Sequence, residues 1–239
     1  MKDLDDQLFV VAGATGNVGE GIVRSLLGHG GRVAAIGRDA RKLRVLREQL
    51  APAQRGRLID AVGDIGTFDG AADLVEKIAE RHGAISHGVA SLGDWWRGRP
   101  AWEVTEAEFD RFYVGTSRLH FASMRAIVPR LSSGGSYTML AGLSAIKPIA
   151  NLSLIGMQAA AQVMLGREVQ IDADDRVRIY NLVLGFVINR ARPDGDAGWL
   201  RADEVGDIVA RLAASGSRGR LLRADDRDTA EASLAEAGA

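Results

Sequence analysis

The sequence predicts a doubly wound α/β fold, in which one parallel sheet carries helices on both faces. A short apolar run, residues 8–12, ends at a glycine-rich turn, and a helical pattern follows it, with Val18, Ile22 and Leu26 at four-residue spacing. Strand-like and helix-like segments then alternate along the chain, which is typical of a parallel sheet. The 239 residues are 46% hydrophobic and show neither an internal repeat nor a linker-like break in composition. We therefore expect a single domain spanning residues 1–239.

Most elements can be assigned from apolar runs and stop signals. Short apolar runs bounded by glycine or polar residues predict strands, and apolar residues at three- and four-residue spacing predict helices. Thr105 and Glu108 form a capping box, so one helix is expected to begin at Thr105. The expected strands cover about residues 8–12, 32–37, 57–62, 85–90, 136–140, 177–184 and 220–222; the expected helices end near residue 29, cover 40–50 and 69–81, begin at 105, and cover 152–172 and 203–214. The polar, alanine-rich end, residues 225–239, is expected to fray.

Composition argues against several classes of function. The net charge of −1 is unlike that of an electrostatic nucleic-acid or membrane binder, and no apolar run is long enough to span a bilayer. The absence of cysteine excludes disulfides and thiolate metal sites and is compatible with a reducing compartment. The four histidines are scattered without ligand spacing, and the acidic start, residues 1–6, is unlike a signal peptide. We therefore expect a cytoplasmic protein that binds no metal, no nucleic acid and no membrane.

The glycine turn after the first expected strand is the strongest functional motif. Gly13 can make the tight turn that leaves the strand, Gly16 leaves room for a pyrophosphate to approach the backbone, and Gly19 allows close packing of the next helix. The N-terminus of that helix would offer free N–H groups to the phosphates. A glycine-rich turn that binds nothing is the alternative, but the strand–turn–helix context favours a dinucleotide. The expected contacts are Gly13, Thr15, Gly16, Asn17, Val18 and Gly19.

Charged residues after the second expected strand indicate which dinucleotide is bound. At this place a carboxylate accepts hydrogen bonds from the ribose 2′-hydroxyl of NAD, whereas an arginine pairs with the 2′-phosphate of NADP. Arg38 comes first, Asp39 follows it, and Arg41 and Lys42 add positive charge. We therefore favour NADP(H) over NAD(H). In the alternative interpretation Arg38 is only solvated and Asp39 caps the next helix, in which case Asp39 would point away from the ribose.

A loop with three tryptophans leaves the fourth expected strand. Ligands of open α/β sheets bind beyond the carboxyl ends of strands, so the tryptophans and two arginines of this loop could stack on and pair with a planar anionic ligand. The simpler interpretation is that the tryptophans pack the loop against the protein or lie in a subunit interface. These residues are Trp95, Trp96, Trp102, Arg97 and Arg99.

The helix expected at residues 152–172 is rich in small side chains. Gly156, three consecutive alanines at 159–161 and Gly166 would let another helix approach closely. We therefore expect a homodimer or homotetramer with this helix at its interface.

The order of these elements resembles the short-chain dehydrogenase/reductase family over about residues 7–224. The glycine turn is similar to that of the family's extended and atypical branches, Arg38 looks like its NADP-type determinant, and Asp64-Ile65 looks like its adenine-side pair. Residues 90–93, Ala-Ser-Leu-Gly, fall where the family usually has Asn-Asn-Ala-Gly, and Leu184-Gly185 falls where it usually has Pro-Gly beside the nicotinamide. The resemblance implies a Rossmann-type oxidoreductase with further cofactor contacts at Arg38, Asp64, Ile65, Ala90, Ser91, Leu92, Gln158 and Gly185.

The family's proton-transfer residues find no match in this sequence. The family uses a tyrosine, a lysine four residues later, a serine and an asparagine, and by spacing these fall on Leu154, Gln158, Ala141 (or Gly142) and Thr116. The tyrosines, Tyr113, Tyr137 and Tyr180, are followed four residues later by Ser117, Ala141 and Leu184, so the chain contains no Tyr-x-x-x-Lys. Leucine and alanine cannot donate a proton.

Two functional interpretations therefore stay open. The first is an NADP(H)-dependent oxidoreductase whose proton donor is displaced or supplied by the substrate. Ser144 and Lys147 are the candidates for a displaced donor, although Lys147 could simply be solvated. The second is a catalytically silent NADP(H)-binding sensor or scaffold subunit, and a redox-neutral isomerase or cyclase is a further option. The histidines are interpreted as structural.

Overall fold

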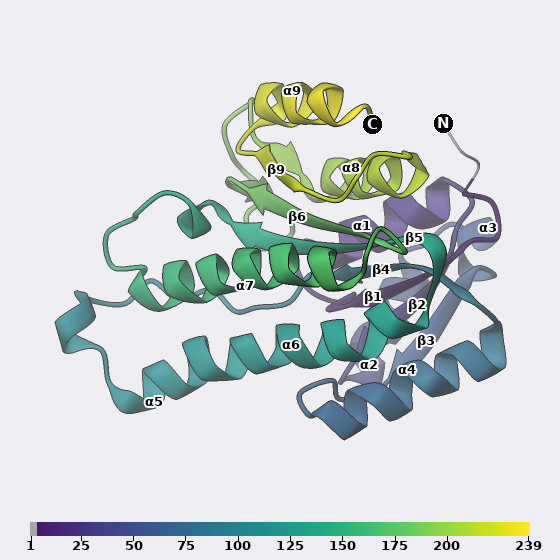
Figure 1. The fold of residues 1–239 in the computed structure, drawn as a ribbon, viewed down its shortest axis with the longest axis horizontal. Coiled ribbons are helices and arrows are strands. Elements are labelled where there is room, and N and C mark those ends of the chain that lie inside the picture. The colour runs from purple at the N-terminus through teal and green to yellow at the C-terminus, as the bar shows by residue number, and fades with distance from the viewer. Residues whose placement is uncertain (1–3) are drawn as a thin grey trace.

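A seven-stranded parallel sheet forms the centre of the molecule and confirms the predicted doubly wound fold. The computed structural model describes residues 4–239, so the first half of the acidic start lies outside the described residues. The strand order is β3-β2-β1-β4-β5-β6-β9, which reverses beside β1 (Figure 1). Ligands of such sheets bind at this reversal. The strands are β1 (Leu8–Ala12), β2 (Arg32–Gly37), β3 (Leu58–Val62), β4 (Ile85–Ala90), β5 (Leu131–Gly142), β6 (Arg178–Leu184) and β9 (Leu221–Ala224).

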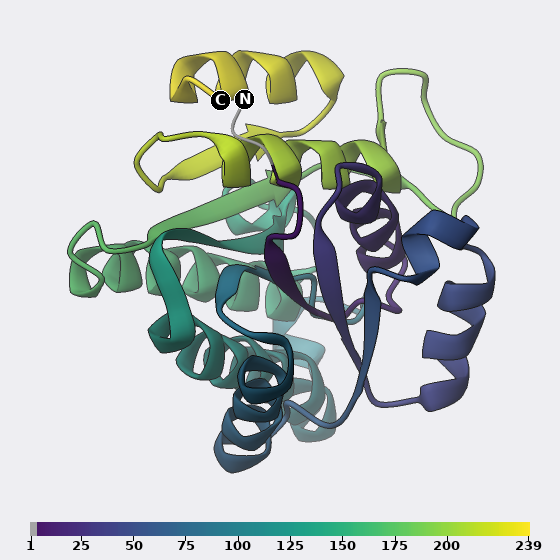
Figure 2. The same cartoon turned by 90° about the vertical axis from the view of Figure 1, so that its right-hand side faces the viewer.

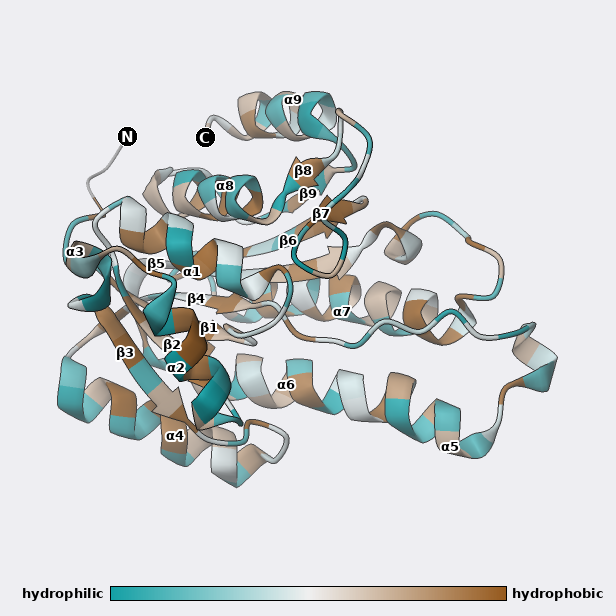
Figure 3. Cartoon of the chain, turned by 180° about the vertical axis from the view of Figure 1, so that it is seen from behind, coloured by the Kyte–Doolittle hydropathy of each residue, from teal (hydrophilic) through white to brown (hydrophobic). Residues whose placement is uncertain are grey.

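Helices cover both faces of the sheet because the strands are apolar on both sides. Along β1, Phe9 and Val11 join one buried cluster, whereas Leu8, Val10 and Ala12 join another. One face carries α1 (Gly19–Gly28), which packs on α8 (Ala202–Ala214), and the other carries α4 (Phe68–His82), α6 (Thr116–Ile127) and α7 (Ser153–Asp172) (Figure 2). In Figure 3 the strands are largely hydrophobic, while the helices alternate between hydrophilic and hydrophobic residues.

Shorter elements complete the fold. A short α5 (Glu106–Glu108) begins at the predicted capping box, where the Thr105 side chain accepts a hydrogen bond from the Glu108 N–H, and continues through a π-helical segment (Phe109–Gly115) into α6. A small two-stranded parallel sheet, β7 (Val187–Ile188) and β8 (Leu200–Arg201), borders the loop after β6. The remaining helices are α2 (Ala40–Glu48) and α3 (Pro52–Arg55). Across residues 4–239, no helix combines the length and the apolar character needed to cross a membrane.

The C-terminal segment is ordered, so the prediction that residues 225–239 fray is wrong. Residues Arg227–Ala237 form α9, which begins at Asp226, whose side chain accepts a hydrogen bond from the Thr229 N–H at 2.8 Å. Ala230, Leu234 and Ala237 are buried, and their spacing places them on one face of the helix. The alanine-rich composition therefore reflects a capped helix that packs on the core beside β9 and α8 (Figure 1).

Candidate functional site

Backbone segments meet closely where β1 and β4 end, and this contact explains two glycines of the turn. Gly13 has a φ of +81°, and a Cβ at this position would overlap the carbonyl oxygen of Ser91. A Cβ at Gly19 would overlap the carbonyl oxygen of Gly13. The Ser91 N–H donates to the carbonyl oxygen of Ala12 at 3.0 Å, which extends the pairing of the two strands beyond their ends. Gly13 and Gly19 are therefore required by the fold itself.

Gly16 has a different environment from the other two glycines. A Cβ at Gly16 would lie 3.1 Å from the carbonyl oxygen of Gly13 and 4.0 Å from that of Ser91, with no closer neighbour. Gly16 also lines a cavity together with Asn17 and Val18. Gly16 is therefore less crowded than Gly13 and Gly19, although its contact with the Gly13 carbonyl oxygen is tight, and its missing side chain leaves room on the cavity side of the turn.

An outer cavity of about 390 Å³ lies between the glycine turn and α2. Asp39 lines it and caps α2, since its Oδ1 accepts a hydrogen bond from the Arg41 N–H at 2.8 Å. That backbone hydrogen bond, with a second one from the Arg41 side chain, lowers the pKa of the Asp39 carboxyl. Arg41 and Lys42 line the cavity too, whereas Arg38 is exposed and does not line it. The cap expected as an alternative role of Asp39 is present, and two of the cations that line the cavity, Arg41 and Lys42, come from α2.

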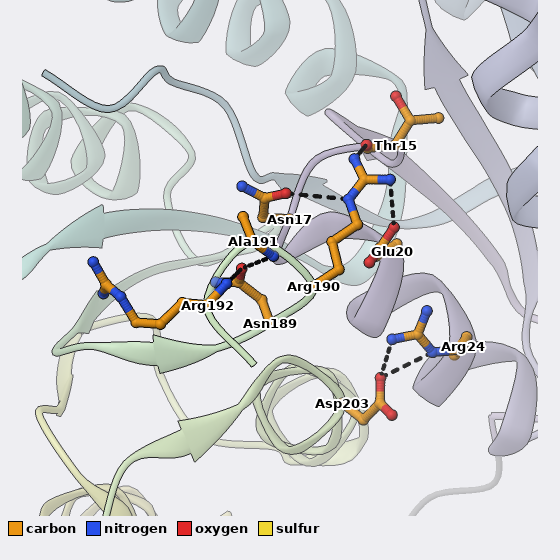
Figure 4. A network of polar contacts seen from close by, with 9 residues as sticks. All are labelled: Thr15, Asn17, Glu20, Arg24, Asn189, Arg190, Ala191, Arg192 and Asp203. Atoms are coloured by element: carbon orange, nitrogen blue, oxygen red, sulfur yellow. Dashed lines mark hydrogen bonds and ion pairs between the residues drawn. The ribbon is translucent and has the colours of Figure 1, made fainter. Parts of the chain in front are cut away.

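Arg190 closes one side of the outer cavity and was not singled out from the sequence. Its Nε donates to Asn17 Oδ1 at 3.2 Å, and its Nη2 donates to the Thr15 carbonyl oxygen at 3.2 Å (Figure 4). Its Nη1 lies 3.5 Å from Oε2 of Glu20, whose side chain is only 9% exposed. Arg190 thus ties the loop after β7 to the glycine turn. The available signal in the sequence is a pair of arginines, at 190 and 192, just after the sixth strand.

A central cavity of about 490 Å³ lies at the carboxyl ends of β1, β4, β5 and β6. The glycine turn, residues 91–93, residues 140–142 and the loop after β6 contribute its lining. Among the lining residues in the described part of the chain, a single charged side chain, Arg192, is present. Its guanidinium carbon lies 4.8 Å from the ring centroid of Phe186 and 5.8 Å from that of Trp199. This second cavity is therefore mostly uncharged, with one cation beside aromatic rings.

Comparison with known proteins decides the family. Residues 13–220 match the family model described as enoyl-(acyl carrier protein) reductase. The chain belongs to the short-chain dehydrogenase/reductase family. It is 25% identical over 216 residues to an uncharacterized oxidoreductase of Staphylococcus saprophyticus, which covers 87% of this chain and 90% of the relative.

Solved structures of other proteins share the fold. An alcohol dehydrogenase from the archaeon Thermococcus sibiricus, complexed with 5-hydroxy-NADP, superimposes with a TM-score of 0.81 at 23% identity and covers 92% of this chain and 96% of its own. A blue fluorescent protein from a metagenomic library, in complex with NADPH, gives a TM-score of 0.82 at 20% identity and covers 94% of this chain and 98% of its own. At these sequence identities the two structures show a shared fold and nothing further about this chain.

The structure brings together part of the cofactor site predicted for this short-chain dehydrogenase/reductase. Ile65 and Ala90 are buried, and Asp64 Oδ1 accepts a hydrogen bond from the Gly66 N–H at 2.9 Å. Gln158 is also buried, and its Nε2 donates to Gln162 Oε1 at 3.3 Å. None of these four residues lines the outer or the central cavity. Residues that do line the central cavity are Gly16, Asn17, Val18, Ser91, Leu92 and Gly185, and Thr15 lines the outer one.

Gly185 has a structural reason of its own to be glycine. A Cβ at this position would overlap the backbone of Asp225, and the Gly185 N–H donates to the carbonyl oxygen of Ala224 at 3.1 Å. The glycine at the family's Pro-Gly position therefore permits close packing against the last strand as well as lining the central cavity.

The two proton-transfer candidates named from the sequence, and the tyrosines Tyr137 and Tyr180, do not line the central cavity. Lys147 is exposed, Ser144 lies in a 3-10 turn (Leu143–Ala145), and neither lines the cavity. Tyr137 is fully buried, which raises the pKa of its phenol, and its hydroxyl contacts Ser123 Oγ at 3.0 Å. Tyr180 donates to the carbonyl oxygen of Ser217 at 2.7 Å, and neither tyrosine is among the lining residues.

Three of the positions that spacing predicts for the family's catalytic residues lie in different surroundings. Leu154 is buried in a cluster with Trp96 and Phe112, and Thr116 is buried in α6. Ala141, by contrast, lines the central cavity. None of these three side chains carries a group that ionises.

Two buried histidines have structural partners. His87 in β4 contacts Ser136 Oγ at 2.8 Å and Gln7 Oε1 at 2.7 Å. His120 in α6 donates from Nε2 to the carbonyl oxygen of Leu92 at 3.1 Å, and burial lowers its pKa to about 4. His120 therefore stays neutral near pH 7 and anchors the segment that leads from β4 into the central cavity. Within residues 4–239, no group of three or more histidine, aspartate or glutamate side chains could hold a metal ion.

The tryptophans of the loop after β4 differ in their surroundings: one packs against the protein and another lines the central cavity. Trp96 is buried on Phe112, with ring centroids 5.8 Å apart, so it packs the loop against the protein. Trp95 is 59% exposed and lines the central cavity, whereas Trp102 is 86% exposed. Arg99 pairs with Glu108 at 3.3 Å. The arginine that faces Trp95 is Arg192, which comes from the loop after β7.

Proposed function

We propose that this chain binds NADP(H) across the carboxyl edge of the sheet and acts as an NADP(H)-dependent oxidoreductase. The observation that carries the proposal is the pair of cavities on either side of the glycine turn. Three cations, Arg41, Lys42 and Arg190, and two carboxylates, Asp39 and Glu20, line the outer cavity, whereas the central cavity is mostly uncharged. The anionic 2′-phosphate of NADP would suit the net positive outer cavity, and the planar nicotinamide, which supplies the hydride, would suit the central one.

The residues present fit the cofactor. Gly16 lines the central cavity, and α1, which has no side-chain cap at its N-terminus, begins directly after the turn, so its positive end would face the phosphates. Gly16, Asn17 and Val18 would hold the pyrophosphate. Arg41 and Lys42, with Arg38 beside them, would hold the 2′-phosphate, since each is a cation close to the carboxyl end of β2.

The lining of the central cavity supports the proposal that the family's tyrosine chemistry is absent here. Among the described residues, the lining includes no carboxyl, imidazole, phenol or lysine side chain, and Ser91 offers only a hydroxyl. A proton needed at the reacting atom would therefore come from water or from the substrate itself. The same observation supports, as a second candidate, a protein that binds NADP(H) without turning it over, as a sensor or scaffold subunit.

Calorimetric titration of NADPH and NADH tests the cofactor assignment. A charge-assisted contact with the 2′-phosphate contributes about 1.5–3 kcal/mol, so we expect NADPH to bind at least roughly ten-fold more tightly than NADH. Arg41→Ala and Lys42→Ala, both at positions that line the outer cavity, should each reduce this preference, whereas Arg44→Ala, an exposed cation of α2 that does not line it, should leave it unchanged. Equal affinities in the parent protein would refute the NADP assignment, and no binding of either cofactor would refute dinucleotide binding.

A further inference from the structure

Arg192 lines the central cavity, where three aromatic rings surround its guanidinium. Its guanidinium carbon lies 4.8 Å from the ring centroid of Phe186, 5.8 Å from that of Trp199 and 6.0 Å from that of Trp95. Phe186 and Trp199 also pack on each other, with ring centroids 4.7 Å apart. The negative faces of aromatic rings attract a guanidinium, so this arrangement restrains the side chain without using its N–H groups.

The backbone of Arg192 is restrained as well. Its N–H donates to the carbonyl oxygen of Asn189 at 3.0 Å, and its own carbonyl oxygen accepts from the Asn189 N–H at 2.9 Å. Asn189 Oδ1 lies 3.1 Å from the same Arg192 nitrogen. The turn from 189 to 192 is therefore closed by hydrogen bonds at its base.

The guanidinium of Arg192 has no carboxylate partner within ion-pair distance among residues 4–239. Arg190, two residues earlier, is the opposite case, since it pairs with Glu20 and faces the glycine turn. Figure 4 shows the two side chains pointing in different directions from the same turn. The fork of N–H donors on Arg192 is thus available to an anion in the central cavity.

We propose that the central cavity takes a planar substrate that carries a carboxylate, and that Arg192 binds this carboxylate while the substrate's ring lies beside Trp95. Apart from the residues assigned to the pyrophosphate, the rest of the lining is uncharged and includes Leu92, Leu184 and Val187, which suits an apolar planar body. This inference rests on the proposed function only in that the substrate shares the cavity with the nicotinamide end of the cofactor.

Matched ligands with and without the negative charge test the inference. The titrants are 2-naphthoate and 2-naphthylmethanol, added to the full chain by calorimetry, once without cofactor and once with saturating NADPH. We expect the carboxylate to bind at least roughly ten-fold more tightly than the alcohol in one or both states. Arg192→Gln should remove this preference while changing the affinity for the alcohol less than two-fold, and Arg192→Lys should retain part of it.

Arg125→Gln is the matched control, because Arg125 also rests on an aromatic ring, Phe68 at 5.1 Å, but lies on α6 and does not line the central cavity. It should leave both affinities unchanged. Equal binding of the two ligands, a preference that survives Arg192→Gln, or no binding of the carboxylate at millimolar concentration in either state would overturn the inference. NADPH titrated alone reads out the proposed function separately, since its failure to bind leaves the preference for the carboxylate measurable. Should Arg192→Gln fail to fold, the loss of affinity in Arg192→Lys and its salt dependence decide the question.

Discussion

His120 should make the stability of this protein fall as the pH drops below about 6.5. The histidine is fully buried in α6, donates from Nε2 to the carbonyl oxygen of Leu92 at 3.1 Å, and has no partner for Nδ1 among the described residues. Burial lowers its pKa from 6.5 to about 4, because the charged form loses its hydration. The unfolded chain therefore takes up the proton at a higher pH than the folded one.

The pKa difference sets the size of the effect. The neutral ring is present in both states above pH 6.5, so His120 adds no pH dependence there. As the pH falls from 6.5 toward 4, the unfolded state alone gains a proton, and the free energy of unfolding decreases by up to about 1.4 kcal/mol per pH unit. Over the whole interval the loss attributable to this one side chain is about 3 kcal/mol.

Urea unfolding at a series of pH values between 7.5 and 4.5 measures this loss, with His120→Gln as the variant. Glutamine can still donate to the Leu92 carbonyl oxygen but does not titrate, so the difference between the two proteins cancels the contribution of the carboxylates. The variant should lose less stability than the parent over this interval, whereas His82→Gln should behave as the parent does. Parallel curves for the parent and His120→Gln would refute the reasoning, as would an NMR titration in which the ring of His120 gains a proton near pH 6.5.

The remaining predictions concern the glycine turn, the assembly and the chemistry. Gly16→Val should reduce NADPH affinity at least ten-fold at nearly unchanged melting temperature. Gly19→Ala should instead lower the free energy of unfolding by about 1–3 kcal/mol, because its Cβ would overlap the backbone of the turn. The reverse pattern would contradict the roles assigned to these two glycines. Met164, half exposed on α7, should lie in a homo-oligomer interface, so light scattering should show an oligomer that Met164→Glu dissociates, and a monomeric parent would refute this. Followed at 340 nm, unactivated ketones should be reduced about 10²–10⁴-fold more slowly than is usual for an enzyme with a positioned acid; rapid turnover would mean that another side chain donates the proton, with Ser144→Ala and Lys147→Ala as the first variants to measure.

The sheet and the glycine turn were predictable because their signals are local. A strand that ends in glycines and leads into a helix restricts the backbone within a dozen residues, and alternating segments then fix the parallel order. What spacing could not separate was the role of each glycine. Gly13 and Gly19 are required by contacts with carbonyl oxygens, one of which comes from Ser91, far along the chain. Gly16 is the least crowded of the three and lines the central cavity, and only the folded structure makes that distinction.

The contacts of Arg190 and Arg192 could not be predicted from the sequence. Neither belongs to a motif, and both contact residues more than 90 positions away in the chain, namely Asn17 and Trp95. The sequence led instead to Arg99, which is next to the tryptophans in the chain but pairs with Glu108. A charged residue near an aromatic one in sequence carries little information about which ring it meets, because that contact is made by the tertiary fold.

The turn from residue 189 to 192 connects the two cavities through the side chain of Asn189. Its Oδ1 accepts hydrogen bonds from the N–H groups of Ala191 and Arg192, at 2.9 and 3.1 Å, and this geometry holds the backbone so that Arg190 reaches the glycine turn while Arg192 faces the aromatic rings. Neither guanidinium needs to be ordered at the moment a ligand binds, which lowers the entropic cost of binding at both cavities. Alanine at position 189 would remove these two hydrogen bonds, and the one that Nδ2 donates to the Val187 carbonyl oxygen, while leaving the side chains of both arginines in place. We therefore expect the loss of the Asn189 amide to weaken the binding of the cofactor and of the substrate together, although this amide contacts neither guanidinium.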